Sequence, residues 1–256
     1  MIDWAELTLF MYISARMSGF VLFNPIFGRS GIPASFRAGM VLALSVFVMA
    51  TVTEPVTVAV PATVIEMAIR IFLELAIGYI LGLVMNFFFF IPQMAGEVID
   101  TQMGMSMAQT YDPGSQANLS TTGRLLNVLM TLLFFAANGH HTLMRILATS
   151  GQVIPFGEAA LSNRAVNASI QVFLECTVLA VKLSMPILAA ELIGQMGMGI
   201  LMKVIPQINV FAINIELKVI IGMVLLLLLM APFGEFLLQV ESKMLDSMAQ
   251  ILSLTG

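Results

Sequence analysis

Long apolar stretches follow one another along the whole chain, and each is about as long as a helix that crosses a membrane. We expect six helices from them, at about residues 5–24, 38–53, 67–91, 124–148, 168–193 and 211–233. A spanning helix needs about 20 residues, so a chain of 256 residues has room for six helices and their connections. The pattern therefore predicts an all-α membrane protein, built from about six long and partly broken apolar helices arranged as hairpins.

Charged residues interrupt the first, third and fifth of these stretches. They are Arg16, Arg70, Glu74, Glu175, Lys182 and Glu191. A charge near the centre of a lipid-exposed helix costs about 2.5–3.5 kcal/mol. We therefore expect these helices to pack against protein or to line a wet cavity, rather than to face lipid on every side.

The carboxylates in these stretches admit two hypotheses. Glu74, Glu175 and Glu191 could form a pathway for ions or protons. Alternatively, they are paired, since Glu74 lies four residues after Arg70 and Glu175 lies seven residues before Lys182. A neighbouring subunit could also supply the partner. We favour pairing, because an uncompensated buried charge is strongly destabilising.

Composition narrows the class of protein further. Apolar residues make up 59% of the chain and charged residues only 10%, with 11 basic and 15 acidic side chains. Soluble domains carry about 25% charged residues, so a soluble monomer, a disordered tail and a basic nucleic-acid binder are excluded. A single cysteine, Cys176, excludes a disulfide framework. Asp3 and Glu6 precede the first basic residue, Arg16, so we expect no secretory signal peptide.

Few residues could carry catalysis or bind a metal. His140 and His141 are adjacent, and neighbours on a helix point about 100° apart, whereas metal-binding pairs usually lie three or four residues apart. The chain has no HExxH, GxSxG, P-loop or GxGxxG motif. We expect helix-end packing for the histidines and a buried thiol for Cys176, and neither enzymatic activity, a metal nor a cofactor.

A polar segment of 28 residues, from Gly96 to Gly123, separates the third and fourth stretches. It is longer than an ordinary connection between helices. Met103, Met105 and Met107 lie together in it, and methionine is deformable, so these side chains could fill a core or seal a constriction. Composition alone favours the role of filler.

Two glycines of the third stretch, Gly78 and Gly82, form a GxxxG motif. Such a spacing permits two helices to approach closely within a membrane. The motif is frequent by chance in a chain of this composition, so it predicts a packing contact and nothing more specific.

Short motifs occur in a defined order over nearly the whole chain. The N-terminal ones are Arg16, Asn24–Gly28, Ile32–Pro33, Arg37 and Leu42–Ser45. The central ones are Glu74, Gly78, Gly82, Ala95–Gly96, Gln102–Gly104, Ala108, Asp112–Pro113, Asn138–His141, Ser150 and Pro155. The C-terminal ones are Pro186, Gly199, Pro206–Phe211 and Lys218. In this order and spacing the chain resembles the FliR/T-subunit family of the flagellar and type III secretion export gate, and its flagellar branch more than its virulence branch.

The resemblance implies a fold and a function. The fold would resemble the FliP and FliQ subunits fused in one chain, with a FliP-like part at 1–165 and a FliQ-like helical hairpin at 166–256. The protein would join FliP and FliQ in a hetero-oligomeric gate of the bacterial inner membrane, in the flagellar basal body, with FlhA and FlhB as further partners. Unfolded flagellar proteins would pass through this gate. Membrane lipid would contact the gate. The resemblance implies no cofactor and no nucleic acid.

The resemblance also implies two narrow places in the channel. The segment of about 102–123 would form a plug, in which the residues of interest are Gln102, Met103, Gly104, Met105, Met107, Tyr111, Asp112, Pro113, Gly114 and Gly123. Its glycines supply flexible joints, and its methionines would pack loosely and be displaced when the gate opens. A cytoplasmic constriction would lie at Pro206, Gln207, Asn209 and Phe211.

Two other classes of protein remain as alternatives. A stand-alone secondary transporter or ion channel would use the intramembrane carboxylates, and it would be expected to contain sequence repeats, which we do not find. An intramembrane enzyme would use His140 or His141 and would need a further ligand or catalytic partner nearby. Only an export-gate subunit accounts for both the charge-interrupted helices and the long polar connector.

Overall fold

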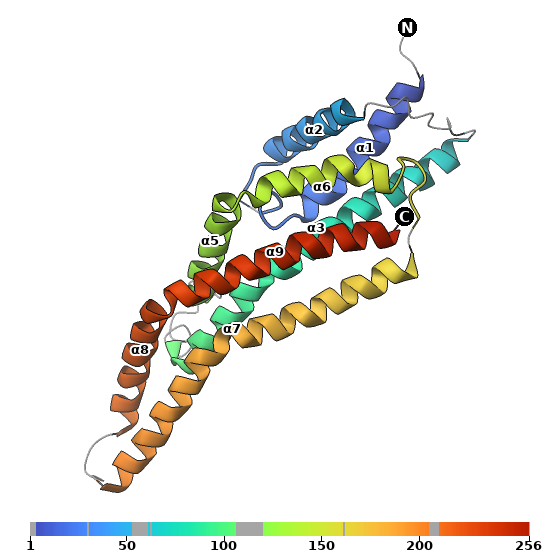
Figure 1. Ribbon diagram of the computed structural model, residues 1–256. Coiled ribbons are helices and arrows are strands. Elements are labelled where there is room, and N and C mark those ends of the chain that lie inside the picture. Colours follow the sequence, from blue (N-terminus) through green and yellow to red (C-terminus); the bar gives the residue numbers. More distant parts are fainter. Residues whose placement is uncertain are drawn as a thin grey trace. The chain divides into compact units, whose positions relative to one another are not determined.

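The computed structural model describes residues 4–29, 31–52, 61, 63–105, 120–160, 162–204 and 210–255, with the backbone alone at 210–215 and 255. Within these residues every regular element is helical, which confirms the all-α class (Figure 1). The helices are α1 (Trp4–Phe23), α2 (Ala34–Thr51), α3 (Val64–Gln102), α5 (Thr121–Ala136), α6 (Gly139–Val153), α7 (Asn163–Val204), α8 (Val210–Leu228) and α9 (Met230–Thr255).

The lengths of several helices differ from those of the six stretches that the sequence predicts. In the described part of the chain, 4 helices, α1, α2, α3 and α7, are long and apolar enough to cross a membrane, or up to 5 if the bent pair α8 and α9 counts as one span. Two of them, α3 with 39 residues and α7 with 42, are much longer than the predicted stretches 67–91 and 168–193. Pro92 follows the predicted stretch in α3, and three glycines, Gly194, Gly197 and Gly199, follow the one in α7, yet neither ends the helix.

The predicted fourth span, 124–148, is wrong as a single helix. The chain breaks into α5, with 16 residues, and α6, with 15 residues, at Asn138, which has φ 60°. Asparagine is among the few residues that adopt this left-handed conformation readily. Its carbonyl then accepts a hydrogen bond from the backbone N–H of His141 at 3.0 Å and starts α6. An apolar pattern does not reveal such a backbone turn.

The polar connector is also shorter than predicted, because α3 continues through Pro92 and Gly96 to Gln102. Its last turns bury Ala95, Ile99 and Met103, which lie at i, i+4 and i+8 on one face. At the other end of the chain, the predicted stretch 211–233 bends by 61° after Leu228 and continues as α9.

The chain forms two compact units. The first comprises residues 1–88, 135–174 and 241–256, and in it α1 packs on α2 and α2 on α6. Its core is built around Tyr12, Ile13, Met17, Phe20 and Phe88, all of which are fully buried. The apolar residues of α1 therefore face protein as well as the surroundings.

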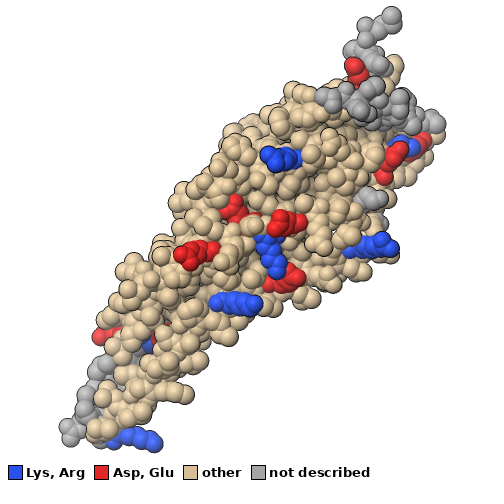
Figure 2. All heavy atoms as spheres, viewed as in Figure 1, with Lys and Arg blue, Asp and Glu red and all other residues tan. Residues whose placement is uncertain are grey.

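The second unit comprises residues 89–134 and 175–240. Its core contains Phe89 and Phe134, whose rings meet edge to face with centroids 6.3 Å apart, and the buried Leu126, Met130 and Phe233. Charged side chains occupy little of the face drawn in Figure 2, as expected for a membrane protein.

Candidate functional site

The first unit contains a fully buried ion pair between α1 and α3. Arg16 Nε donates to Glu74 Oε2 at 2.6 Å, and both side chains have 0% exposure. Arg16 lies on the buried face of α1, about one turn of helix after Tyr12 and one turn before Phe20. The packing of α1 on α3 therefore brings together charges that are 58 residues apart in the sequence.

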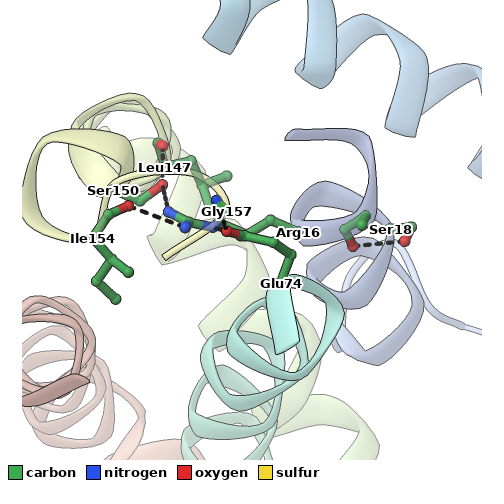
Figure 3. A network of polar contacts seen from close by, with 8 residues as sticks. Arg16, Ser18, Glu74, Leu147, Ser150, Ile154 and Gly157 are labelled. Carbon is green, nitrogen blue, oxygen red and sulfur yellow. Dashed lines mark hydrogen bonds and ion pairs between the residues drawn. The ribbon is translucent and has the colours of Figure 1, made fainter. Parts of the chain in front are cut away.

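The two terminal nitrogens of Arg16 and the second carboxylate oxygen of Glu74 also form hydrogen bonds (Figure 3). The two terminal nitrogens of Arg16 donate to Ser150 Oγ at 3.2 Å and to the carbonyl of Ile154 at 3.1 Å. Glu74 Oε1 accepts from the backbone N–H of Gly157 at 2.8 Å. We call these five residues the Arg16 cluster.

The Arg16 cluster is well suited to structural fastening. It joins α1, α3, α6 and the turn that follows α6, and the guanidinium also lies 4.3 Å from the ring centre of Phe156. A buried ion pair needs good geometry and further hydrogen bonds to its spare positions, and here each nitrogen of the guanidinium group and each oxygen of the carboxylate has a partner. Both oxygens of the Glu74 carboxylate are bonded, one to Arg16 of α1 and the other to Gly157 in the turn after α6. Such a carboxylate is poorly placed to carry ions or protons through the membrane.

The local spacing rule gave the wrong partner for Glu74. Arg70 pairs instead with Glu66, one turn earlier on α3, at 2.6 Å, and donates to the carbonyl of Gly157 at 3.2 Å. The spacing i, i+4 is met equally by Glu66 and by Glu74, so it cannot decide between them. Tertiary packing decides, because Glu74 faces Arg16 in the core while the Arg70–Glu66 pair is partly exposed.

The GxxxG glycines lie directly beside this ion pair. A Cβ atom on Gly78 would overlap the backbone carbonyl oxygen of Arg16, and one on Gly82 would approach the carbonyl oxygen of Phe20 to 2.9 Å. Gly19 on α1 has the same relation to Leu75 on α3. The two helices thus touch backbone to backbone, which is the contact that small residues permit in membranes.

The charges of α7 do not gather into one site. Glu175 and Lys182 are exposed, whereas Glu191 is buried at 1% exposure, and its Oε1 has no hydrogen-bond partner within the described chain. Sequence reasoning missed a similar residue in α9, Glu241, which is buried at 3%. The available signal was its spacing, because Glu241 lies four residues after Leu237 and three before Met244 on the apolar face of α9.

The two histidines contact each other and an aromatic ring. Their rings lie with centroids 4.1 Å apart at the start of α6, and His140 also stacks near Phe135 at 5.4 Å. Among the described residues, no group of three or more His, Cys, Asp or Glu could hold a metal ion. Cys176 is buried.

The structure describes part of the predicted plug. Gln102 ends α3, Gly104 has φ +77°, Met105 is half-buried, and Gly123 lies in the first turn of α5. Met107, Tyr111, Asp112, Pro113 and Gly114 lie outside the described residues, as do Pro206, Gln207 and Asn209 of the predicted constriction. Phe211 lies in α8, where only the backbone is described.

Met103 of the predicted plug is buried. This side chain has 0% exposure, and a Cβ atom on Gly222 of α8 would overlap it. Met103 therefore fills a slot beside a glycine. It lies four residues after Ile99, at the end of the buried stripe of α3.

These features define an all-helical integral membrane protein whose helices are fastened by a buried ion pair. A family model described as "Bacterial export proteins, family 1" matches residues 7–244, and the chain belongs to this family.

Relatives over nearly the whole length agree with this assignment. The chain is 27% identical over 254 residues to the flagellar biosynthetic protein FliR of Bacillus subtilis (strain 168), covering 96% of this chain and 95% of that protein. It is 26% identical over 251 residues to the protein of the same name from Escherichia coli (strain K12), covering 96% and 94%. It is 27% identical over 194 residues to the Yop proteins translocation protein T of Yersinia pestis, covering 75% and 74%. The chain is therefore a component of a type III export apparatus.

Proposed function

We propose that this protein is a core subunit of the flagellar type III export gate, and that it helps to form and close the channel through which unfolded flagellar proteins cross the bacterial inner membrane. The observation that carries the proposal is the similarity to flagellar proteins named FliR, which extends over 96% of the chain. The match to a translocation protein of the Yop system covers less of the chain, which favours the flagellar basal body.

The lengths of α3 and α7 support assembly with other membrane subunits. A helix rises about 1.5 Å per residue, so the 42 residues of α7 extend over about 63 Å, roughly twice the 30 Å of a hydrocarbon core. Large apolar side chains are nevertheless exposed along it from Val166 to Val204. Since lipid covers only about half of such a length, protein must cover much of the rest.

The partners of the proposed gate are FliP and FliQ in a hetero-oligomer, with FlhA and FlhB beside them in the export apparatus. The family resemblance supports this set. It also supports a FliP-like part at 1–165 and a FliQ-like part at 166–256, in which the second would contain α7, α8 and α9. In such an assembly the exposed apolar faces of these helices contact neighbouring subunits as well as lipid.

The segment of about 102–123 is proposed as the plug of the closed channel, and the segment of 206–211 as a cytoplasmic constriction. Support for the plug comes from its position between the end of α3 and the start of α5, and from Gly104, whose φ of +77° ends the helix. Because Met103 is anchored in the core, the displaceable part of the plug begins after this residue.

The alternative of a stand-alone transporter loses its support. The relatives described above are named for flagellar biosynthesis and for Yop protein translocation, and Glu74 is committed to Arg16. The proposed role is that of a structural channel subunit with no catalysis of its own.

Native mass spectrometry after extraction in a mild detergent tests the proposal. The chain is coexpressed with FliP and FliQ, and then expressed without them. We expect a defined hetero-oligomer in the first case and poor recovery of the chain in the second. A well-behaved monomer or homodimer that is indifferent to the partners would contradict the proposal.

A further inference from the structure

A second buried polar group connects the last turn of α3 to the start of α5. Asp100 Oδ2 accepts a hydrogen bond from Ser120 Oγ at 2.7 Å and another from the backbone N–H of Thr122 at 3.3 Å. The exposure of Asp100 is 3% and that of Ser120 is 6%. Since these residues flank the proposed plug, we call Asp100, Ser120, Thr122 and Gly123 the plug base.

Ser120 in turn caps α5. Its Oγ accepts from the backbone N–H of Gly123 at 2.8 Å, three residues later, which is the bond of an N-cap serine. The carboxylate of Asp100 adds a negative charge beside the same helix end, where exposed N–H groups favour an anion. One side chain of α3 therefore both orients the cap and accepts from the first turn of α5.

The helices around the plug base are in close contact. A Cβ atom on Gly96 would overlap the backbone of Gly123, so that α3 and α5 touch without side chains between them. One turn further along α5, Asn127 Nδ2 donates to the carbonyl of Phe89 at 3.0 Å. The plug base is thus the end of a continuous contact between the two helices rather than an isolated hydrogen bond.

The position of Met103 adds to the rigidity of the α3 side. Its backbone N–H donates to the carbonyl of Ile99 at 2.9 Å, and its buried side chain occupies the slot beside Gly222. Both flanks of the segment that follows Gly104 and precedes Ser120 are therefore held by buried contacts. Nothing in these contacts has the loose character that a moving part requires.

We propose that Asp100 is a positioning residue that keeps the two flanks of the plug joined in the open gate as well as in the closed one. The proposal rests on the proposed function, which it deepens by separating a fixed base from the part that moves. Asp100 acts through Ser120 and α5 and touches no transported chain in this role.

Substitutions at Asp100 distinguish a role of its side chain as a hydrogen-bond acceptor from a role in filling space. Asn at this position keeps an acceptor oxygen for Ser120 and Thr122, whereas Leu fills a similar volume and accepts nothing. In proteoliposomes containing the assembled gate, we expect Asp100→Leu to raise ion leakage about fivefold or more, as the loss of a helix cap would shift a closed–open equilibrium. Asp100→Asn should stay close to the unsubstituted protein, and Ser120→Ala should fall between them. Equal leakage from Asp100→Leu and the unsubstituted gate would overturn the proposal.

A cysteine pair tests directly whether the flanks stay joined. Asp100→Cys and Ser120→Cys are combined in a chain that also carries Cys176→Ala, with each single cysteine variant as a control. When the pair is oxidised, we expect export of flagellar proteins at the level of the parent Cys176→Ala chain and low leakage, and when it is reduced, high leakage. Export that is blocked by oxidation and restored by a reductant would show that the flanks separate on opening, and would overturn the proposal.

Deletion of Met105–Asn118 distinguishes failure of this proposal from failure of the proposed gate. The deletion should raise ion leakage if the segment is a plug. Leakage from the deletion but not from Asp100→Leu would reject the role of Asp100 alone. No effect of the deletion on leakage would reject the plug, and with it both proposals. Native mass spectrometry of each variant establishes that the gate has assembled. If the Asp100→Leu gate does not assemble, the export and leakage of the oxidised cysteine pair test the proposal instead.

Discussion

At the scale of single residues, the first unit contains a buried ion pair whose two side chains also form further hydrogen bonds. In the Arg16 cluster, the guanidinium donates to a carboxylate, a hydroxyl and a carbonyl. Removing one member leaves another polar group buried without a partner, which costs far more than the net contribution of the intact pair. The pair is therefore better understood as a condition for the correct packing of α1 than as a source of stability.

Replacement of Glu74 by methionine should destabilise the protein by about 3–5 kcal/mol, because Arg16 would remain charged in an apolar core. The double variant, with Arg16→Met as well, should be more stable than Glu74→Met alone. Thermal unfolding of the detergent-solubilised gate compares the three proteins.

The matched control for this prediction is the second ion pair of α3. The Arg70–Glu66 side chains are 27% and 38% exposed, so Glu66→Gln should change stability by no more than about 1 kcal/mol. Equal losses from Glu74→Met and Glu66→Gln would show that burial does not govern the cost of breaking these pairs.

At the scale of helices, the contact between α1 and α3 is set by glycine. Gly78 lies where the backbone of Arg16 passes, so even one methyl group forces the helices apart and misplaces the Arg16 cluster. We expect Gly78→Ala to cost about 1–3 kcal/mol, the usual range for overpacking, and to lower recovery of the assembled gate.

Gly234 in α9 offers the control, since a Cβ atom there meets nothing within 4 Å. Alanine is the better helix former, so Gly234→Ala should be neutral or stabilise by up to about 1 kcal/mol. The prediction fails if the two substitutions have the same effect on the midpoint of thermal unfolding.

The sequence predicted the helical class well because apolar stretches are a strong signal, and α1 and α2 lie within a few residues of the expected bounds. The prediction of helix bounds was wrong where backbone geometry or burial, rather than hydropathy, decides where a helix ends. The turn at Asn138 is a property of backbone dihedrals, and the extension of α3 to Gln102 depends on burial of Ile99 and Met103.

The candidate sites were predictable only in part, for a related physical reason. Arg16 and Glu74 were each recognised as intramembrane charges, but their pairing depends on a contact across 58 residues that local spacing cannot supply. Asp100 was missed altogether. Its signal was the cap pattern around Ser120 and Gly123, which marks the start of α5 but does not identify a partner on α3.

At the scale of the whole molecule, the exposed apolar surface of α7 is longer than a bilayer is thick. A helix tilted by 40° needs about 26 residues to cross 30 Å of hydrocarbon, and α7 has 42. A chain of this kind cannot be covered by lipid alone at every exposed position, so its free form is expected to aggregate or to be degraded.

Photo-reactive side chains at Val166, Leu174, Leu192 and Val204 would map this coverage, since all four positions are exposed on α7. In the assembled gate we expect adducts with protein at one end of the helix at least, because about 16 of its residues exceed the tilted span. Mass spectrometry identifies the adducts, with the buried Ile187 as the control position. Adducts with lipid alone at all four positions would contradict this expectation.

The Arg16 cluster also has a consequence for how the protein is made. Arg16 is synthesised 58 residues before Glu74 and 134 residues before Ser150. At a translation rate of about 5–20 residues per second, α1 waits roughly 3–12 s for its counter-charge and roughly 7–27 s for its last side-chain partner. During this interval a lone arginine in the first helix opposes entry into lipid by about 2.5–3.5 kcal/mol. We therefore expect the insertion machinery to retain α1 at a wet, protein-lined interface until the later helices arrive.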